Sequence, residues 1–197
     1  NHLEEAEHYV RDGLQENETW RNIMTDGFGL LALARILRAK ADSAGAMRVV
    51  EQFESRLLEQ SQPREFSEDL HTLSINIQLA GGDLENPSRW ADRLVLSEDY
   101  QHDAEIYRLT LARIRLAQGR YAEVEQLLTG KALPIAAGSQ VARELESRLL
   151  QAAAVARQGR LQEALTLLDD CLATAEPQGY IRVFLDAGDA VRDLLAA

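Results

Sequence analysis

Apolar residues recur every three or four positions along most of the chain, which is the spacing of one face of an α-helix. The first helix is expected over residues 2–16, with its apolar face formed by Leu3, Ala6, Val10 and Leu14. The next is expected over residues 19–39. Its second half is apolar almost all round, which is typical of a helix buried between neighbours. No stretch alternates apolar and polar residues at a period of two, so strands are not expected.

A six-residue segment recurs along the chain and divides this pattern into repeats. Its clearest copy is residues 159–164, and weaker copies start at residues 1, 41, 82 and 119, a spacing of 37 to 41 residues. A period in this range indicates stacked helical hairpins. We interpret each copy as a hairpin turn. Its first residue, Gly or another small residue, ends one helix, and a small apolar residue five places on permits close packing of the next.

These signals predict an all-α fold, a right-handed superhelix of antiparallel helix pairs with about ten helices. We expect a single repeat domain over residues 1–197. Its hairpins are expected at about 1–17 (half), 18–60, 63–96, 99–129 and 138–176, followed by capping helices at 177–197.

The chain begins with Asn at a copy of the turn, so we expect a fragment of a longer protein in which the first helix has lost its partner. The apolar face between Leu3 and Leu14 must then be covered by the next hairpin or by a second copy of the chain. A homodimer is therefore a possible assembly.

Local signals set the expected helix ends. Glu18 and Thr19 are expected to open the second helix, and Asp42 or Ser43 to cap the third. Asn86 is expected to cap a later helix with Pro87 at its first position.

Composition narrows the class of partners. The net charge of the 197 residues is −11, which repels phosphate backbones and anionic lipids, so neither nucleic acid nor a membrane is an expected partner of this segment. No apolar run approaches the ~18 residues of a membrane span, and we expect no signal peptide. The single Cys171 cannot form an internal disulfide, so we expect a reducing cytoplasm and a buried helix position for this residue.

Catalytic and metal-binding patterns are missing from the sequence. The four His are scattered, and no pair has the spacing of a metal site. Gly130-Lys131 lacks the rest of a phosphate-binding loop. We therefore expect no enzyme activity, no metal and no cofactor in this segment, and a hydrolase or transferase on a helical scaffold is the least favoured interpretation.

Hairpins with a Gly-x-[LY]-x-[ED]-Ala turn resemble tetratricopeptide repeats. The longer period near 40 is similar to the repeat domain of MalT-like, LuxR-type bacterial transcription regulators. Three stretches carry the resemblance: 109–124, 153–165 and 176–188. The last contains Pro-x-Gly-Tyr-x-Arg-x-Phe-x-Asp-x-Gly, which closes the repeat domain in that family. Two positions depart from the pattern, Arg115 in place of an apolar residue and Pro87 in place of Ala, and they leave the register of the two middle hairpins open.

The resemblance implies a three-part regulator. An N-terminal ATPase module would bind ATP, this superhelical domain would sense a signal, and a C-terminal domain would bind DNA. An inducer bound to the sensor would lead the protein to self-associate on ATP and activate transcription. ATP and DNA are thus partners only of domains outside this chain.

Candidate binding residues follow from the repeat register. The ascending helices of such arrays line the concave face, where partners bind. Six residues before each turn stand Arg35, Asn76, Arg113 and Ala153. The first three would form a polar ladder along the groove, for a small-molecule inducer or a peptide. The alternative is that they face solvent or pair with local carboxylates such as Glu105.

Two functions remain open. The first is a ligand-sensing module of a transcription regulator, and the second is a repeat scaffold for protein binding or self-assembly without a small ligand. In the closing motif, Tyr180 and Phe184 share one helix face, which favours a cap on the end of the array over ligand contact.

Overall fold

The computed structural model describes residues 2–20, 22–59, 66–96, 100–129 and 140–196. Within these ranges the chain forms eleven α-helices, one 3-10 helix and no strand, so the predicted all-α class is confirmed. The helices form two compact units, residues 1–83 and 84–197, which are described separately below. A single superhelical domain over 1–197 stays a prediction. No described helix is both long and apolar enough to cross a membrane.

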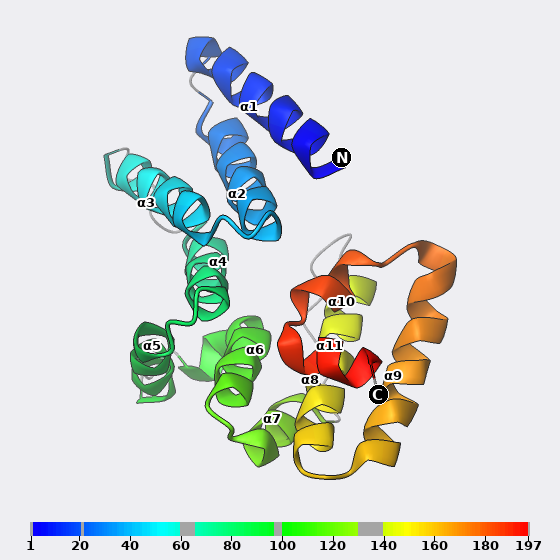
Figure 1. The fold of residues 1–197 in the computed structure, drawn as a ribbon. Coiled ribbons are helices and arrows are strands. Elements are labelled where there is room, and N and C mark those ends of the chain that lie inside the picture. The colour runs from blue at the N-terminus through cyan, green and yellow to red at the C-terminus, as the bar shows by residue number, and fades with distance from the viewer. Residues whose placement is uncertain (1, 21, 60–65, 97–99, 130–139, 197) are drawn as a thin grey trace. The chain divides into compact units, whose positions relative to one another are not determined.

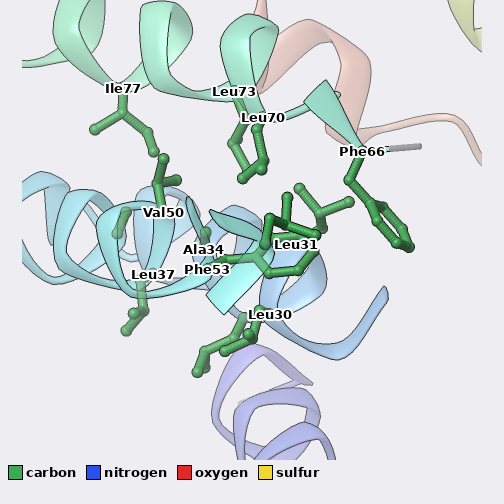
Figure 2. Close-up of a cluster of buried hydrophobic side chains, with 13 residues drawn as sticks. Leu30, Leu31, Ala34, Leu37, Val50, Phe53, Phe66, Leu70, Leu73 and Ile77 are labelled. Atoms are coloured by element: carbon green, nitrogen blue, oxygen red, sulfur yellow. The ribbon is translucent and has the colours of Figure 1, made fainter. Parts of the chain in front are cut away.

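Unit 1 is built around its second helix. It contains α1 (His2–Trp20), α2 (Ile23–Ala39), α3 (Ser43–Glu59) and α4 (Ser67–Ala80), and α2 packs against the other three (Figure 1). Apolar side chains from α2, α3 and α4, with Phe66, meet in one core (Figure 2). Val10 and Leu14 of α1 pack on this core, so the next hairpin covers the face of the first helix, one of the two arrangements expected.

Two glycines permit the close packing of α2. A Cβ atom added to Gly27 would lie 2.5 Å from Cζ of Phe66, and one added to Gly29 would lie 2.7 Å from Cδ2 of Leu14. Phe66 itself packs edge-on against Phe53, with ring centroids 5.2 Å apart. Gly27 and Gly29 therefore allow the side chains of Phe66 and Leu14 to pack closely against α2.

Unit 2 is a row of helices closed by two short ones. Its elements are α5 (Glu85–Leu96), α6 (Tyr100–Ala117), α7 (Tyr121–Leu128), α8 (Gln140–Arg157), α9 (Leu161–Ala175), η1 (Glu176–Gln178), α10 (Arg182–Asp186) and α11 (Asp189–Leu195). Each of α5 to α9 packs on the next, and α10 and α11 pack on α8 (Figure 1). We call α10 and α11 together the cap. Its Phe184, Val191 and Leu194 enter the core of α8 and α9, as the sequence predicts for Phe184.

The four described turns of the repeat share one geometry. The first residue of each copy has a positive φ, between 63° and 84°, at Ala41, Gly82, Gly119 and Gly159. The N–H of the following residue donates to a carbonyl five residues back, at 2.9 to 3.3 Å, which is the longer bond of a Schellman motif. Five places after the first residue, the predicted small apolar position is buried in every copy, at Ala46, Pro87, Val124 and Ala164. The turns that begin at residues 82 and 119 therefore have the same register as the other two, although Pro87 and Arg115 depart from the family pattern.

Several predicted helix ends are wrong by a few residues. α1 continues to Trp20, and α2 begins at Ile23 because the Asn22 side chain accepts the N–H groups of Met24 and Thr25. α5 begins at Glu85, ahead of the predicted Asn86 cap. Pro87 fits the first turn of a helix, where its missing N–H has no intrahelical partner.

One expected helix cap is confirmed, and two apolar residues of α9 are exposed. Asp42 Oδ1 accepts the N–H of Gly45 at 2.7 Å, so it caps α3. Leu161 and Leu172 of α9 are exposed, whereas Ala164, Leu168 and Cys171 are buried. Leu161 is the first residue of the helix, and Leu172 lies one position away from the buried stripe. The apolar second half of α2 is buried between its neighbours as expected, except for Phe28, which is 62% exposed.

Candidate functional site

The three predicted binding residues lie at one register position of different helices. Counting back from the first residue of each turn, Arg35, Asn76, Arg113 and Ala153 stand at position −6 of α2, α4, α6 and α8. Arg35 and Asn76 belong to unit 1, and Arg113 and Ala153 to unit 2. The structure gives each a different environment.

Arg35 forms an exposed ion pair with the next ascending helix. Its Nη2 lies 3.3 Å from Oδ1 of Asp69 on α4, and the two side chains are 55% and 58% exposed. Asp69 stands 13 residues before its own turn, at position −13. Exposed pairs of this kind hold the guanidinium weakly, so the donors of Arg35 remain accessible to a partner.

Asn76 carries an acceptor without a partner. Its side chain is half-buried on α4, and its Oδ1 atom is shielded from solvent with no hydrogen-bond donor among the described residues. Burying an amide oxygen without a donor is unfavourable. Asn76 and Asp69 are seven residues apart, so they lie two turns apart on one face of α4.

Arg113 repeats the Arg35 pair in a covered form. Its Nε lies 2.9 Å from Oε1 of Glu146 on α8, and Glu146 again stands at position −13. Its Nη1 donates to the backbone carbonyl of Asp186, at the end of α10, at 2.9 Å. The Arg113 side chain is 14% exposed. The carboxylate named in the sequence alternative, Glu105, has its side chain outside the described residues, and the observed partner is Glu146.

Ala153, the fourth residue at this position, lies beneath the cap. It is fully buried in the core that receives Phe184 and Val191. One further contact ties the cap to α8, from Arg157 Nη2 to Oδ2 of Asp193 at 2.9 Å. In unit 2 the face defined by position −6 is therefore occupied by the chain's own C-terminal segment.

The closing motif is a structural element of this cap. Gly179 and Gly188 have φ values of 70° and 91°, which only glycine adopts without strain. Arg182 pairs with Asp186 one turn later, at 2.9 Å from Nη2 to Oδ1. The motif thus shapes the turns around α10 and holds the carbonyl that Arg113 contacts.

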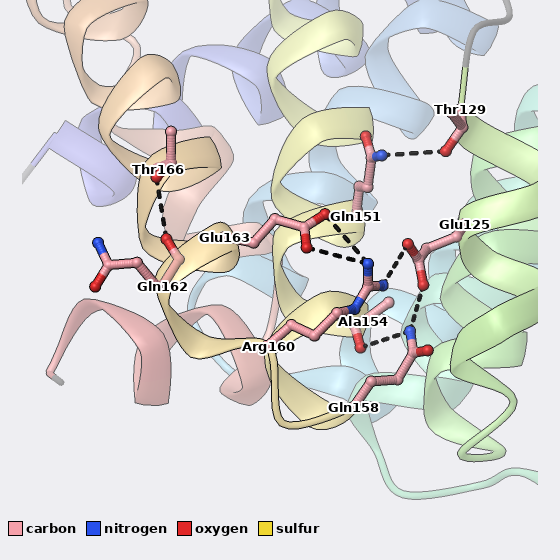
Figure 3. A network of polar contacts seen from close by, with 9 residues as sticks. All are labelled: Glu125, Thr129, Gln151, Ala154, Gln158, Arg160, Gln162, Glu163 and Thr166. Atoms are coloured by element: carbon pink, nitrogen blue, oxygen red, sulfur yellow. Dashed lines mark hydrogen bonds and ion pairs between the residues drawn. The ribbon is translucent and has the colours of Figure 1, made fainter.

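A second polar network joins successive turns in unit 2. Gln118, just before one turn, donates to Ser88 Oγ at 2.8 Å. At the equivalent position of the next turn Gln158 donates to Glu125, which Arg160 also contacts (Figure 3). The hydrogen bond from Arg160 is the main cause that lowers the pKa of Glu125 below its ordinary value of 4.5.

Arg115, the residue that departs from the family pattern, is buried, and its charge is paired and hydrogen-bonded. Its side chain is 7% exposed and donates to Oε1 of Gln118 at 2.7 Å. Oε2 of Glu123 lies 3.4 Å from its Nε. Since a buried charge is tolerated when it is paired and hydrogen-bonded, the arginine replaces an apolar residue without changing the register of the turn.

The remaining candidates are one cysteine, the metal-ligand residue types and one open hollow. Burial raises the pKa of the Cys171 thiol to about 11, so this residue is an unreactive core side chain. Among the described residues no three His, Cys, Asp or Glu side chains gather as metal ligands. An open hollow of about 320 Å³ lies between α8 and α9, lined by Gln140, Val141, Glu144, Leu145, Arg148 and Thr174.

Comparison with known protein families decides the assignment. The family model described as the MalT-like TPR region matches residues 1–197. The chain belongs to this family. No curated protein and no solved structure matches it. The resemblance drawn from the turns and the closing motif is thus confirmed, and the helical repeats described above are those of a MalT-like TPR region.

Sequence reasoning missed the carboxylates at position −13. Asp69 and Glu146 pair with the arginines of the preceding ascending helix, 34 and 33 residues earlier. Both carboxylates stand 13 residues before the first residue of their own turn, and this shared offset could have been recognised in the sequence. It identifies an Arg–carboxylate contact between successive ascending helices, present once in each unit.

Proposed function

We propose that this MalT-like TPR region is the signal-sensing domain of a LuxR-family, ATP-dependent transcription regulator. It would bind a small-molecule inducer or a protein partner and thereby control oligomerisation and transcription activation. ATP and DNA would be bound by neighbouring domains of the regulator, in the cytoplasm. The observation that carries the proposal is the family match over residues 1–197.

The structure supports unit 1 as the binding part. We define the Arg35 face as Phe28, Ala32 and Arg35 of α2 together with Asp69 and Asn76 of α4. Phe28, Arg35 and Asp69 are exposed, and Asn76 is half-buried with an unpaired oxygen. An exposed aromatic ring and an accessible guanidinium are groups that recognise a ligand.

A thermal-shift screen of the chain against sugars, amino acids and hydrophobic inducers tests the proposal. We expect a hit whose stabilisation is lost in Arg35→Gln and kept in Arg48→Gln, a matched change of an exposed arginine on α3. In the full-length regulator, Arg35→Gln should lower inducer-dependent transcription while the melting temperature stays unchanged. An unaltered transcription response in Arg35→Gln would remove the Arg35 face from the sensing role.

The alternative is a protein-interaction scaffold without a small ligand. It is favoured by one observation, that unit 2 uses the equivalent face to hold a peptide segment of its own chain. A screen without any small-molecule hit, together with capture of a protein partner that Arg35→Gln weakens, would support this alternative.

A further inference from the structure

We propose that the Arg35 face binds the end of a short amphipathic helix from a partner protein, in the way that the equivalent face of unit 2 binds the cap. This inference rests on the proposed function and names the class of partner.

Unit 2 shows what its position −6 face binds. The Nε–H of Arg113 donates to Glu146, and an N–H of its Nη1 donates to the carbonyl of Asp186, where α10 ends. The last carbonyls of a helix have no intrahelical donor, so an arginine satisfies them. Next to this contact, the small Ala153 leaves room for apolar side chains of the cap.

Unit 1 has the arginine–carboxylate pair of this arrangement, but none of its other described segments stands in the place of the cap. Arg35 and Asp69 stand at the same two register positions as Arg113 and Glu146. Among the described residues Arg35 makes this one polar contact, so its other donors are free for a carbonyl. Arg35, which corresponds to Arg113 beneath the cap, is thus available for a helix end, and no other described segment of unit 1 covers it.

Two neighbours of Arg35 specify the rest of the partner. Phe28 lies two turns away on the same side of α2 and is 62% exposed, so it suits an apolar side chain. Asn76 contributes a half-buried amide at the edge of the face, and its Oδ1 atom is shielded from solvent.

Charge favours a basic partner. Residues 1–83 carry 8 Lys and Arg against 15 Asp and Glu, a net charge of −7. Such a unit attracts a cationic segment and repels an anionic one. The partner is therefore a basic helix with an apolar side and with its C-terminal carbonyls directed at Arg35.

A peptide made from the chain's own cap is the probe. We compare residues 180–196 with the same peptide carrying Asp189→Lys and Asp193→Lys. Asp193 pairs with Arg157 of α8 in unit 2, whereas the equivalent position of α4 is Ala80, so this aspartate has no partner in unit 1. Binding of labelled peptide to the whole chain is followed by fluorescence anisotropy.

The lysine peptide is expected to bind with a dissociation constant in the micromolar range and at least about tenfold more tightly than the native peptide. Arg35→Gln should weaken it about tenfold or more, and Arg48→Gln should leave it unchanged. Equal binding by the two variants, or no saturable binding, would overturn the inference.

A final comparison separates this inference from the proposed function. If a small molecule stabilises the chain in an Arg35-dependent way and the lysine peptide does not bind, the sensing function stands and the helix partner is wrong. If neither binds at the Arg35 face, both are wrong.

Discussion

The two units carry the same Arg–carboxylate pair in two states. In unit 2 the Arg113–Glu146 pair is mostly buried, and a carbonyl of the cap accepts a hydrogen bond from Nη1 of the arginine. In unit 1 the Arg35–Asp69 pair is more than half exposed and has a longer distance, 3.3 Å against 2.9 Å. The repeat register fixes where the pair forms. Whether it stabilises the fold or binds a partner depends on what covers it.

The largest contrast is expected for the two phenylalanines next to these pairs. Phe184→Ala removes a buried cap side chain and should lower the free energy of unfolding by about 3 kcal/mol. Phe28→Ala removes a mostly exposed ring and should cost less than about 1 kcal/mol. Urea unfolding of both variants measures the difference, and equal losses would mean that the cap is not part of the core.

A smaller contrast is expected for the arginines themselves. Arg113→Met leaves the carboxylate of Glu146 and the carbonyl of Asp186 without their donor, and should cost about 2 kcal/mol. Arg35→Met should change stability by less than about 0.5 kcal/mol, because its pair is exposed. The check is thermal unfolding of the two variants side by side. A costly Arg35→Met would assign that residue to the fold and not to binding.

The turns offer a contrast of opposite sign. Gly159→Ala forces a side chain into a left-handed conformation and should destabilise by about 1 kcal/mol. Ala41→Gly relieves the same strain at φ 63°. Because glycine also gives the unfolded chain more conformational freedom, part of this gain is offset, and the net stabilisation should be about 0.5 kcal/mol. Calorimetry on both variants tests this, and two changes of the same sign would contradict a shared turn geometry.

The smallest effect concerns pH. Because the folded pKa of Glu125 is lowered, its carboxylate stabilises unit 2 above its ordinary pKa of 4.5, and this contribution is lost as the pH falls through the folded value. Glu125→Gln should therefore melt at most about 3 °C below the native chain at pH 7. The gap should narrow as the pH falls below 4.5 and shrink in high salt. A gap that persists in acid would show that the ion pair is not its cause.

The sequence pattern predicted the elements that depend on local signals. The turns at Gly119 and Gly159, the buried position five residues after each, and the closing motif all rest on backbone conformation and on one apolar stripe per helix. These are short-range properties of the chain, so they can be recognised without knowing the neighbours of a helix.

Features that depend on distant contacts were not predictable in the same way. The α1–α2 boundary is set by Asn17, whose amide donates to Asp26 at 2.7 Å, and Asp26 in turn accepts from Arg56 at 2.8 Å. The exposure of Phe28 depends on which side of α2 its neighbours leave open. The environment of Arg113 depends on a cap 73 residues later in the chain. Periodicity identifies the faces of a helix but not what covers them.

Hydrogen exchange of the whole chain with and without the lysine peptide tests the central claim most directly. The account predicts that amides of α2 and α4 become protected on binding, while those of α6 and α8, already covered by the cap, do not change. Protection confined to α8, or spread equally over both units, would contradict the assignment of the open Arg35 face as the binding site.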